Sequence, residues 1–144
     1  MMRYFTHLGG AGFTVLVPVV LILAGGAERA VGLAALVANG ISNVAVQILK
    51  RLVARPRPCD ANGQPLALVP LPDPFSFPSG HASASTALAV TLTAAHPWLG
   101  PVLVPLALLV AASRVTLRVH HPSDVIAGVL LGLAGAAAAL TLLG

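Results

Sequence analysis

Charged residues are scarce in this sequence. They make up 8% of 144 residues, and hydrophobic residues make up 57%; a soluble domain carries about 25% charged residues. With a mean hydropathy of +0.92, the chain lacks the polar residues needed to cover a surface that faces water. We therefore expect an integral membrane protein built from α-helices. Cys59 is the single cysteine, so no disulfide can form within the chain.

The few basic residues are not spread along the chain. The formal net charge is +4, a balance that could suggest a nucleic-acid partner. The basic residues instead gather at the ends of apolar segments, without interleaved aromatic residues. That placement suits a phosphate or a lipid headgroup better than a duplex, so we expect no nucleic-acid partner. The two clusters are Lys50, Arg51, Arg55 and Arg57, then Arg114 and Arg118.

Five apolar segments predict a polytopic, all-α membrane helical bundle of about five transmembrane helices, forming one domain over residues 1–144. The first segment is short for a hydrocarbon core of ~30 Å. Glu28 and Arg29 are expected in a turn after it. Three glycines give the last segment a small-residue packing face. The segments are residues 11–25, 30–53, 79–95, 101–118 and 122–143, and the glycines are Gly128, Gly132 and Gly135.

Two further features concern the polar parts of the chain. Asn39, Asn43 and Gln47 recur at four-residue spacing, and we expect this stripe to face other helices and to form interhelical hydrogen bonds. Residues 54–78 form a long connection with seven prolines. A loop of this length in a small protein is usually functional or disordered, and its apolar residues would allow it to rest on the membrane surface as a lid.

The loop ends at Ser79-Gly80-His81. Ser79 is a good N-cap, and Gly80 allows a ligand to approach the backbone. The free amides of the first helical turn and the helix dipole together favour an anion. His81 has a proton to give or take near neutral pH. These residues alone fit an ordinary capped helix with an incidental histidine equally well.

The helix directions place four polar clusters at the same membrane face. These are the end of the second segment, the start of the third, the end of the fourth and the start of the fifth. Such a convergence of cations and a helix start suits a phosphoryl group. His120 and Asp124 lie one helical turn apart. The aspartate can accept from one imidazole nitrogen and leave the other as a nucleophile, and His81 can then act as acid and base.

Metal ligands are few on this face. Asp60, Asp73 and Asp124 are too few carboxylates for a two-metal phosphatase. The histidines 81, 120 and 121 could bind zinc, but the cations around them argue against that alternative. We expect neither a metal nor another cofactor.

At this point the residues form a recognisable pattern. Lys50 is followed after six residues by Arg57-Pro58; then come Pro78-Ser79-Gly80-His81, and Ser113-Arg114, five residues, His120, three residues and Asp124. This pattern resembles the three-part signature of the type 2 phosphatidic acid phosphatase family, which includes the vanadium-dependent haloperoxidases. The signature spans residues 50–124, about half the chain, and all three parts are present in order.

The resemblance implies a metal-independent lipid phosphatase in which His120 forms a phosphohistidine. It implies that Asp124 orients His120 and that His81 is the general acid. It assigns phosphate binding to Lys50, Arg57, Ser79, Gly80 and Arg114. Arg51, Arg55, Arg118 and His121 lie outside the signature, and we expect them to contact headgroups or the membrane interface.

Bacterial members of the family commonly have six spans, and five are expected here, which puts the N-terminus on the active-site side. Arg3 and both basic clusters then share one face, against Arg29 on the other. The positive-inside rule favours a cytoplasmic active site, whereas the family resemblance favours an outward one. The sequence is compatible with both orientations.

The sequence thus predicts a phosphatase, in a bacterial cell membrane, that removes a terminal phosphate from a lipid. Polyprenyl diphosphate is slightly favoured because the loop is small. Phosphatidylglycerophosphate, phosphatidic acid and polyprenyl-phospho-sugar phosphates are alternatives. A haloperoxidase fits less well, because those enzymes are soluble. The alternative of another class is a non-catalytic lipid-phosphate binder or transporter component. Oligomeric state is not predicted.

Overall fold

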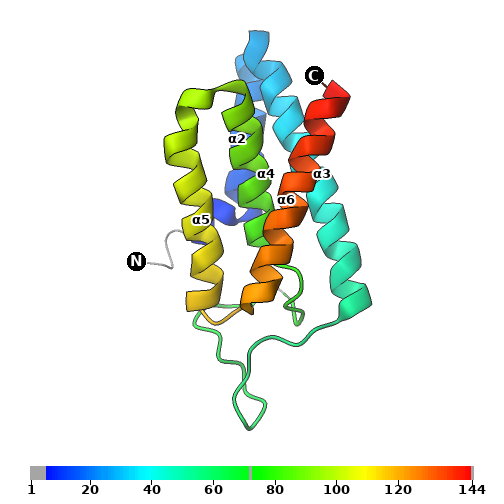
Figure 1. Ribbon diagram of the computed structural model, residues 1–144, viewed down its shortest axis with the longest axis vertical. Helices are drawn as coiled ribbons and strands as arrows, with labels where there is room; N and C mark the ends of the chain where they lie inside the picture. Colours follow the sequence, from blue (N-terminus) through cyan, green and yellow to red (C-terminus); the bar gives the residue numbers. More distant parts are fainter. Residues whose placement is uncertain (1–5, 72, 144) are drawn as a thin grey trace.

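The structure of the chain, a computed structural model, describes residues 6–71 and 73–143. Within these residues five α-helices pack side by side, and two short 3-10 helices connect to them (Figure 1). The helices are η1 (Thr6–Gly9), α2 (Ala11–Ala24), α3 (Gly26–Val53), α4 (Gly80–Ala95), η2 (Pro97–Leu99), α5 (Gly100–Thr116) and α6 (Pro122–Leu143). The all-α bundle predicted from the sequence is therefore confirmed. Arg3 lies outside the described residues.

The helix boundaries agree with the five apolar segments except at the start of α3. Glu28 and Arg29, expected in a turn, lie in the first turns of α3. The turn instead falls on Gly25 and Gly26, whose φ angles are +78° and +57°. Glycine adopts this left-handed region without the steric penalty of a side chain. The chain can therefore reverse within two residues, and the acidic Glu28 lies near the positive end of the α3 dipole.

Three runs of the structure are long and apolar enough to cross a membrane: α3, the η2–α5 run Pro97–Thr116, and α6. α2 is apolar but has only 14 residues, which agrees with the short first segment predicted from the sequence. Large apolar side chains such as Leu16, Leu108 and Leu130 point outward and are exposed. Lipid is the solvent in which such a surface is stable. The protein is thus an integral membrane protein.

α4 lies among α3, α5 and α6 (Figure 1). Its 16 residues are mostly Ala, Ser and Thr, and more than half of them are buried. Close packing is possible because α6 presents glycines to its neighbours. A Cβ at Gly128 would overlap the Ser79 carbonyl oxygen, and one at Gly132 would overlap that of Ser83. The predicted small-residue face of α6 is confirmed, and it fixes the start of α4 against the start of α6.

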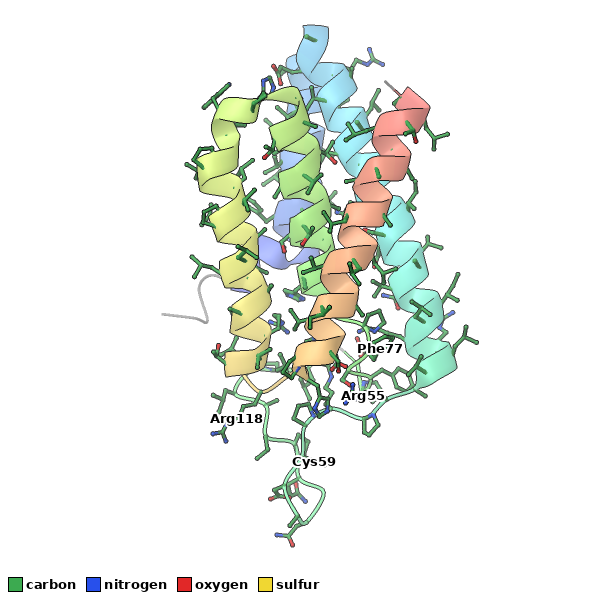
Figure 2. All side chains as sticks on the ribbon, in the orientation of Figure 1. Arg55, Cys59, Phe77 and Arg118 are labelled. Carbon is green, nitrogen blue, oxygen red and sulfur yellow. The ribbon has the colours of Figure 1, made fainter. Side chains whose placement is uncertain are left out.

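The long connection between α3 and α4 lies beyond one end of the bundle, where Figure 2 labels Arg55, Cys59, Phe77 and Arg118. Two isolated antiparallel bridges, Pro56 with Phe75 and Cys59 with Pro65, fold it back on itself. The Leu68 amide donates to the Leu117 carbonyl at 3.1 Å, which ties the loop to the end of α5. The connection therefore brings its own residues to the polar end of the bundle.

Candidate active site

The structure brings the four predicted clusters together at the loop end of the bundle. Lys50 comes from the last turn of α3, and Arg114 from the last turn of α5. The segment from Arg118 to His121 turns back into α6, whose first turn carries Asp124. The start of α4 is linked directly to this turn, because the Ser79 amide donates to the Asp124 carbonyl at 2.9 Å. The second and third parts of the signature therefore form one unit.

Ser79 caps α4 as predicted. Its backbone is extended (φ −78°, ψ 110°), and its hydroxyl accepts from the Ala82 amide at 3.5 Å. A Cβ at Gly80 would lie 3.7 Å from Val46, which is ordinary contact, so protein packing alone does not require glycine there. Gly80 does line a cavity, and the missing side chain leaves the first-turn amides accessible from it.

Two of the predicted phosphate-binding cations meet on one carboxylate. Lys50 Nζ lies 2.5 Å from Asp73 Oδ2, and Arg57 Nη2 donates to Asp73 Oδ1 at 3.1 Å. The Lys50 and Arg57 side chains are buried, whereas Asp73 comes from the loop and is about one-third exposed. A carboxylate with two oxygens shared between two cations occupies the place where phosphate oxygens are expected. The sequence places Asp73 on this face but indicates no role for it there.

The position of Arg57 is fixed by two further hydrogen bonds. Its Nε donates to the Asp73 carbonyl and its Nη1 to the Val119 carbonyl, both at 2.9 Å. Arg114 is buried nearby, and its own carbonyl accepts from the Val119 and His120 amides at 3.2 Å. These contacts bind Val119, the residue before His120, to both arginines. Its carbonyl accepts from the Arg57 side chain, and its amide donates to the Arg114 carbonyl. His120 therefore lies close enough to Arg57 and Arg114 for both positive charges to act on its ring.

His120 is buried, and its Nδ1 lies 2.6 Å from the Ser76 carbonyl oxygen. A carbonyl can only accept, so Nδ1 carries the proton. The predicted partner is different: the distance from Nδ1 to Asp124 Oδ2 is 3.8 Å, too long for a hydrogen bond. The expectation that Asp124 directly fixes the tautomer is therefore wrong in this geometry. The Ser76 carbonyl fixes it instead, and the Asp124 carboxylate lies 3.8 Å from the ring nitrogen.

Asp124 is fully buried and is held by other partners. Its Oδ1 accepts from Arg55 Nη1 at 2.9 Å, and its Oδ2 accepts from the His121 amide at 2.7 Å. Arg55 also donates to the Ser123 hydroxyl at 2.8 Å. Arg55, expected at the lipid interface, instead contacts the site because Ala54, with φ +46°, ends α3 and redirects the chain. No pattern in the sequence distinguishes Arg55 from its neighbour Arg51.

The electrostatics of the site favour a neutral imidazole. Burial, followed by the positive charges of Arg57 and Arg114, lowers the pKa of His120 from 6.5 to about 3. At neutral pH the ring is thus uncharged and has one basic nitrogen. Burial raises the pKa of Asp73, but the hydrogen bond and charge of Lys50 and the charge of Arg57 outweigh it and hold that pKa below 3.8. Asp73 is therefore a carboxylate.

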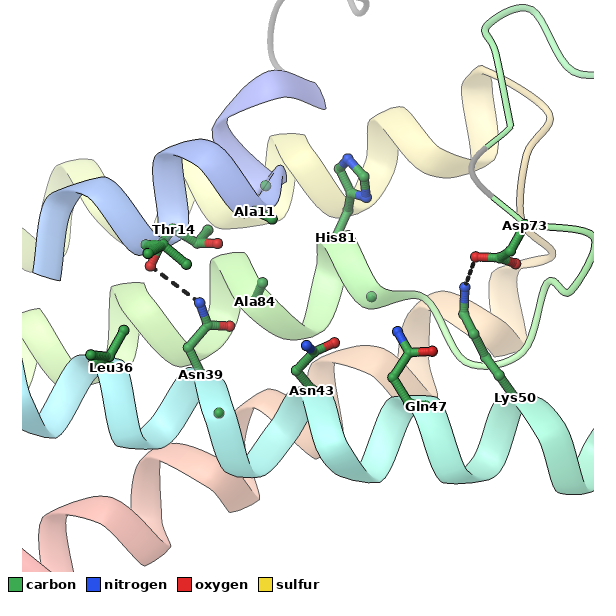
Figure 3. Close-up of a pocket in the computed structure, with 14 residues that line it drawn as sticks. Ala11, Thr14, Leu36, Asn39, Asn43, Gln47, Lys50, Asp73, His81 and Ala84 are labelled. Atoms are coloured by element: carbon green, nitrogen blue, oxygen red, sulfur yellow. Dashed lines mark hydrogen bonds and ion pairs between the residues drawn. The ribbon is translucent and has the colours of Figure 1, made fainter. Parts of the chain in front are cut away.

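His81 is half-buried and lines a cavity of about 460 Å³ between α2, α3 and α4. Figure 3 shows Lys50 and Asp73 at one end of this cavity and His81 nearer its middle. The predicted acid on α4 and Lys50 on α3 therefore line the same cavity. Among residues 6–71 and 73–143, no three His, Cys, Asp or Glu side chains are grouped to hold a metal ion. The three histidines considered as zinc ligands do not form such a group.

These features define a membrane-embedded helical bundle with a cluster of buried cations and a buried histidine at one end. A family model for the PAP2 superfamily matches residues 31–144, so the chain belongs to that family, as its three-part signature indicated.

Among curated relatives, an undecaprenyl-diphosphatase of Sulfolobus acidocaldarius is 38% identical over 105 residues, which cover 72% of this chain and 51% of that protein. A decaprenylphosphoryl-5-phosphoribose phosphatase of Mycobacterium tuberculosis is 43% identical over 103 residues, covering 70% of this chain and 52% of that protein. The chain thus spans about half the length of these curated relatives.

Two solved structures have the same fold. One is a transmembrane PAP2 type phosphatidylglycerolphosphate phosphatase from Bacillus subtilis, with a TM-score of 0.80 and 29% identity over 98% of this chain and 74% of that chain. The other is LpxE from Aquifex aeolicus, with a TM-score of 0.85 and 25% identity over 97% of this chain and 83% of that chain. The fold is therefore that of membrane PAP2 proteins over nearly the whole chain.

Proposed function

We propose that this protein is a metal-independent phosphatase that removes a terminal phosphate from a membrane lipid. The observation that carries the proposal is the environment of His120. Its Nδ1 proton is donated to the Ser76 carbonyl at 2.6 Å, so the lone pair on Nε2 is the nucleophilic one. The lowered pKa keeps that nitrogen unprotonated at pH 7.

In the first step, Nε2 of His120 attacks the terminal phosphorus, and the bond from phosphorus to the lipid-side oxygen breaks. His81 donates a proton to that oxygen, which leaves as an alcohol or as a lipid monophosphate. The phosphohistidine ring keeps its Nδ1 proton and is formally cationic. The Asp124 carboxylate, 3.8 Å away, and the Ser76 carbonyl stabilise this charge.

In the second step, a water molecule attacks the phosphorus of the phosphohistidine. His81, now neutral, accepts a proton from that water, and the bond from phosphorus to Nε2 breaks. Inorganic phosphate leaves, and both histidines return to their initial states. One residue therefore acts as acid and then as base.

Lys50, Arg57 and Arg114, together with the Gly80 amide, hold the phosphate oxygens in both steps. The Ser79 amide, expected to join them, donates to the Asp124 carbonyl at 2.9 Å instead. Asp73 binds both Lys50 and Arg57. The arriving phosphate must therefore replace its carboxylate. A group with more oxygens and more negative charge competes well for the same two cations.

The relatives support a lipid substrate and differ in which lipid they name. Their names include a polyprenyl diphosphate, a polyprenyl-linked phosphoribose and phosphatidylglycerolphosphate. We assign the class that these share, a lipid with a terminal phosphate, in a bacterial cell membrane. Polyprenyl diphosphate, slightly favoured by the small loop, is one member of that class.

The deciding experiment measures inorganic phosphate released from these lipids by the protein purified in detergent, with and without excess EDTA. Turnover that survives EDTA supports the proposal. Binding of the lipid without release of phosphate would favour the non-catalytic alternative. Activity lost with EDTA and restored by Mg²⁺ or Zn²⁺ would mean that a metal mechanism operates.

A further inference from the structure

Three side-chain amides line the cavity beside the phosphate site. Asn39, Asn43 and Gln47 project from one face of α3 and continue in line with Lys50 (Figure 3). At 1.5 Å per residue, Gln47 lies about 4.5 Å from Lys50 along the helix axis, and Asn43 about 10 Å. The amides therefore extend the anion site along α3, away from the loop.

Within the described residues, only Asn39, at the end of the row far from Lys50, forms a side-chain hydrogen bond to another helix. Asn39 Nδ2 donates to the Thr14 carbonyl of α2 at 3.1 Å, so the interhelical hydrogen bond expected for the stripe is formed there. Asn43 and Gln47 are exposed to the cavity, and neither side chain hydrogen-bonds to any part of the chain that the structure describes. The expected interhelical role therefore fails for these two residues.

An amide in this position needs a polar partner. Unsatisfied polar groups are costly where hydrocarbon replaces water. A purely hydrocarbon chain lying over Asn43 and Gln47 would leave their donors and acceptors unpaired. A hydroxylated group would satisfy them, because hydroxyls both donate and accept.

We propose that Asn43 and Gln47 form a subsite for a neutral, hydroxyl-bearing linker that joins the terminal phosphate to the rest of the lipid. A sugar ring and a glycerol unit share this chemistry. The inference rests on the proposed phosphatase function and names its substrate class. It disfavours polyprenyl diphosphate, in which a second phosphate follows the first directly and no hydroxyl is available at the depth of Asn43.

The position of the subsite agrees with this assignment. Lys50, Gly80 and His81 line the same cavity as the amides, so a lipid whose phosphate contacts Lys50 can extend along them within the cavity. The Asn39–Thr14 bond marks the far end of the row. Beyond it, α3 and α2 pack through apolar residues such as Ala35, Val17 and Leu21. The polar stretch of the cavity can therefore contact only the part of the lipid that directly follows the phosphate.

The test compares kcat/KM for three substrates in detergent: a polyprenyl-phospho-ribose 5-phosphate, phosphatidylglycerol phosphate and a polyprenyl diphosphate. The variants are Asn43→Leu, Gln47→Leu and the double variant. Val44→Leu is the matched control, because Val44 is exposed on α3 and does not line the cavity. Asn43→Ala removes the amide without added bulk and takes the place of Asn43→Leu should the leucine variant not fold.

We expect Asn43→Leu to lower kcat/KM about tenfold on hydroxylated substrates, since lost hydrogen bonds to a substrate hydroxyl have effects of this order. The diphosphate should change less than about twofold. A loss on the ribose lipid alone identifies a sugar, a loss on the glycerol lipid alone identifies glycerol, and a loss on both identifies a general hydroxyl subsite.

Equal losses on all three substrates, or no loss on any, would overturn the subsite and leave the phosphatase proposal intact. Absence of phosphate release by the unmodified protein from every substrate would overturn the phosphatase proposal, and the subsite with it.

Discussion

The Nδ1 proton of His120 is donated to the backbone carbonyl of Ser76, 44 residues earlier in the chain, at 2.6 Å. Ser76 is itself fixed, because its amide donates to the Arg55 carbonyl at 2.8 Å and its hydroxyl to the Pro56 carbonyl at 2.9 Å. The tautomer of the proposed nucleophile therefore depends on the folded loop. A backbone acceptor cannot be removed by substitution at Ser76, so tests of the site must act on side chains.

The first prediction concerns the nucleophile. His120→Ala should abolish turnover, because the attacking atom is lost, and such losses reach several orders of magnitude. Vanadate should still bind, because Lys50, Arg57 and Arg114 remain. Phosphate release and vanadate binding are to be measured on the same preparation. The control is His121→Gln, whose side chain has no assigned role in the site; near-normal turnover by the His120→Ala protein would refute the assignment.

The second prediction concerns Asp73. Asp73→Asn removes the negative charge that competes with phosphate for Lys50 and Arg57, so vanadate should inhibit at about fivefold lower concentration, as expected for a salt bridge of about 1 kcal/mol. Asp60→Asn is the control, because Asp60 is exposed and its carboxylate accepts from the Asn62 and Gln64 amides of its own turn. Weaker inhibition of the Asp73→Asn protein would instead mean that Asp73 positions the two cations.

The third prediction concerns Arg55. Arg55→Ala leaves the buried Asp124 carboxylate without its side-chain cation, so we expect kcat to fall at least tenfold and stability by about 1–3 kcal/mol. Arg118→Ala is the control, since Arg118 is exposed and has no assigned contact with the site. Arg55→Lys should restore part of kcat, because it keeps the charge. Equal behaviour of the Arg55 and Arg118 variants in kcat and thermal melting would place Arg55 outside the site.

The fourth prediction uses the pKa of His120. Folding lowers this pKa from 6.5 to about 3, so the unfolded chain binds a proton between these values and the folded chain does not. Stability contributed by the neutral ring is thus present above pH 6.5 and lost as pH falls, by up to about 1.4 kcal/mol per unit. Melting temperatures in detergent between pH 7 and pH 4 should fall less steeply for His120→Asn than for the unmodified protein.

His121→Asn is the control for that series and should keep the steep dependence. Parallel curves for the unmodified protein and His120→Asn would show that the pKa of His120 is not lowered by folding.

Much of the architecture follows from the sequence because it depends on local composition. Apolar runs set the helices within a few residues, and their directions alone bring Lys50, Arg114 and the start of α4 to one end. The contacts that complete the site do not follow in this way. Ser76, Arg55 and Asp73 act from a loop held by isolated bridges and single hydrogen bonds, and no periodicity determines such a conformation.

The amide stripe on α3 is a second case in which the sequence predicts the helix face but not its contacts. Its spacing predicts that three side chains share one face. Whether that face meets a helix or a cavity depends on how far α2 extends beside it. α2 has 14 residues against 28 in α3, so Asn39 meets Thr14 while Asn43 and Gln47 line open space.

The last prediction separates the two histidines. His81 should matter most when the leaving group is poor, such as a lipid alkoxide, because protonation of that oxygen lowers the barrier. On such a substrate His81→Ala should reduce kcat/KM about 10²- to 10⁴-fold. Nitrophenyl phosphate has a leaving oxygen that needs no proton, so the same variant should lose much less on it.

The other variants calibrate this comparison. His120→Ala should fail on both substrates, because the attacking nitrogen is missing. The loss of activity for Asp124→Asn should lie between the losses for His81→Ala and His120→Ala. This variant keeps the geometry of the site and loses the charge beside the ring. His96→Ala is the control and should be unaffected on both, since His96 lies at the end of α4 and pairs with Glu28 at 3.2 Å. Equal losses for His81→Ala on the two substrates would mean that His81 binds phosphate or shapes the cavity, and the protonation of the leaving oxygen would then need another donor.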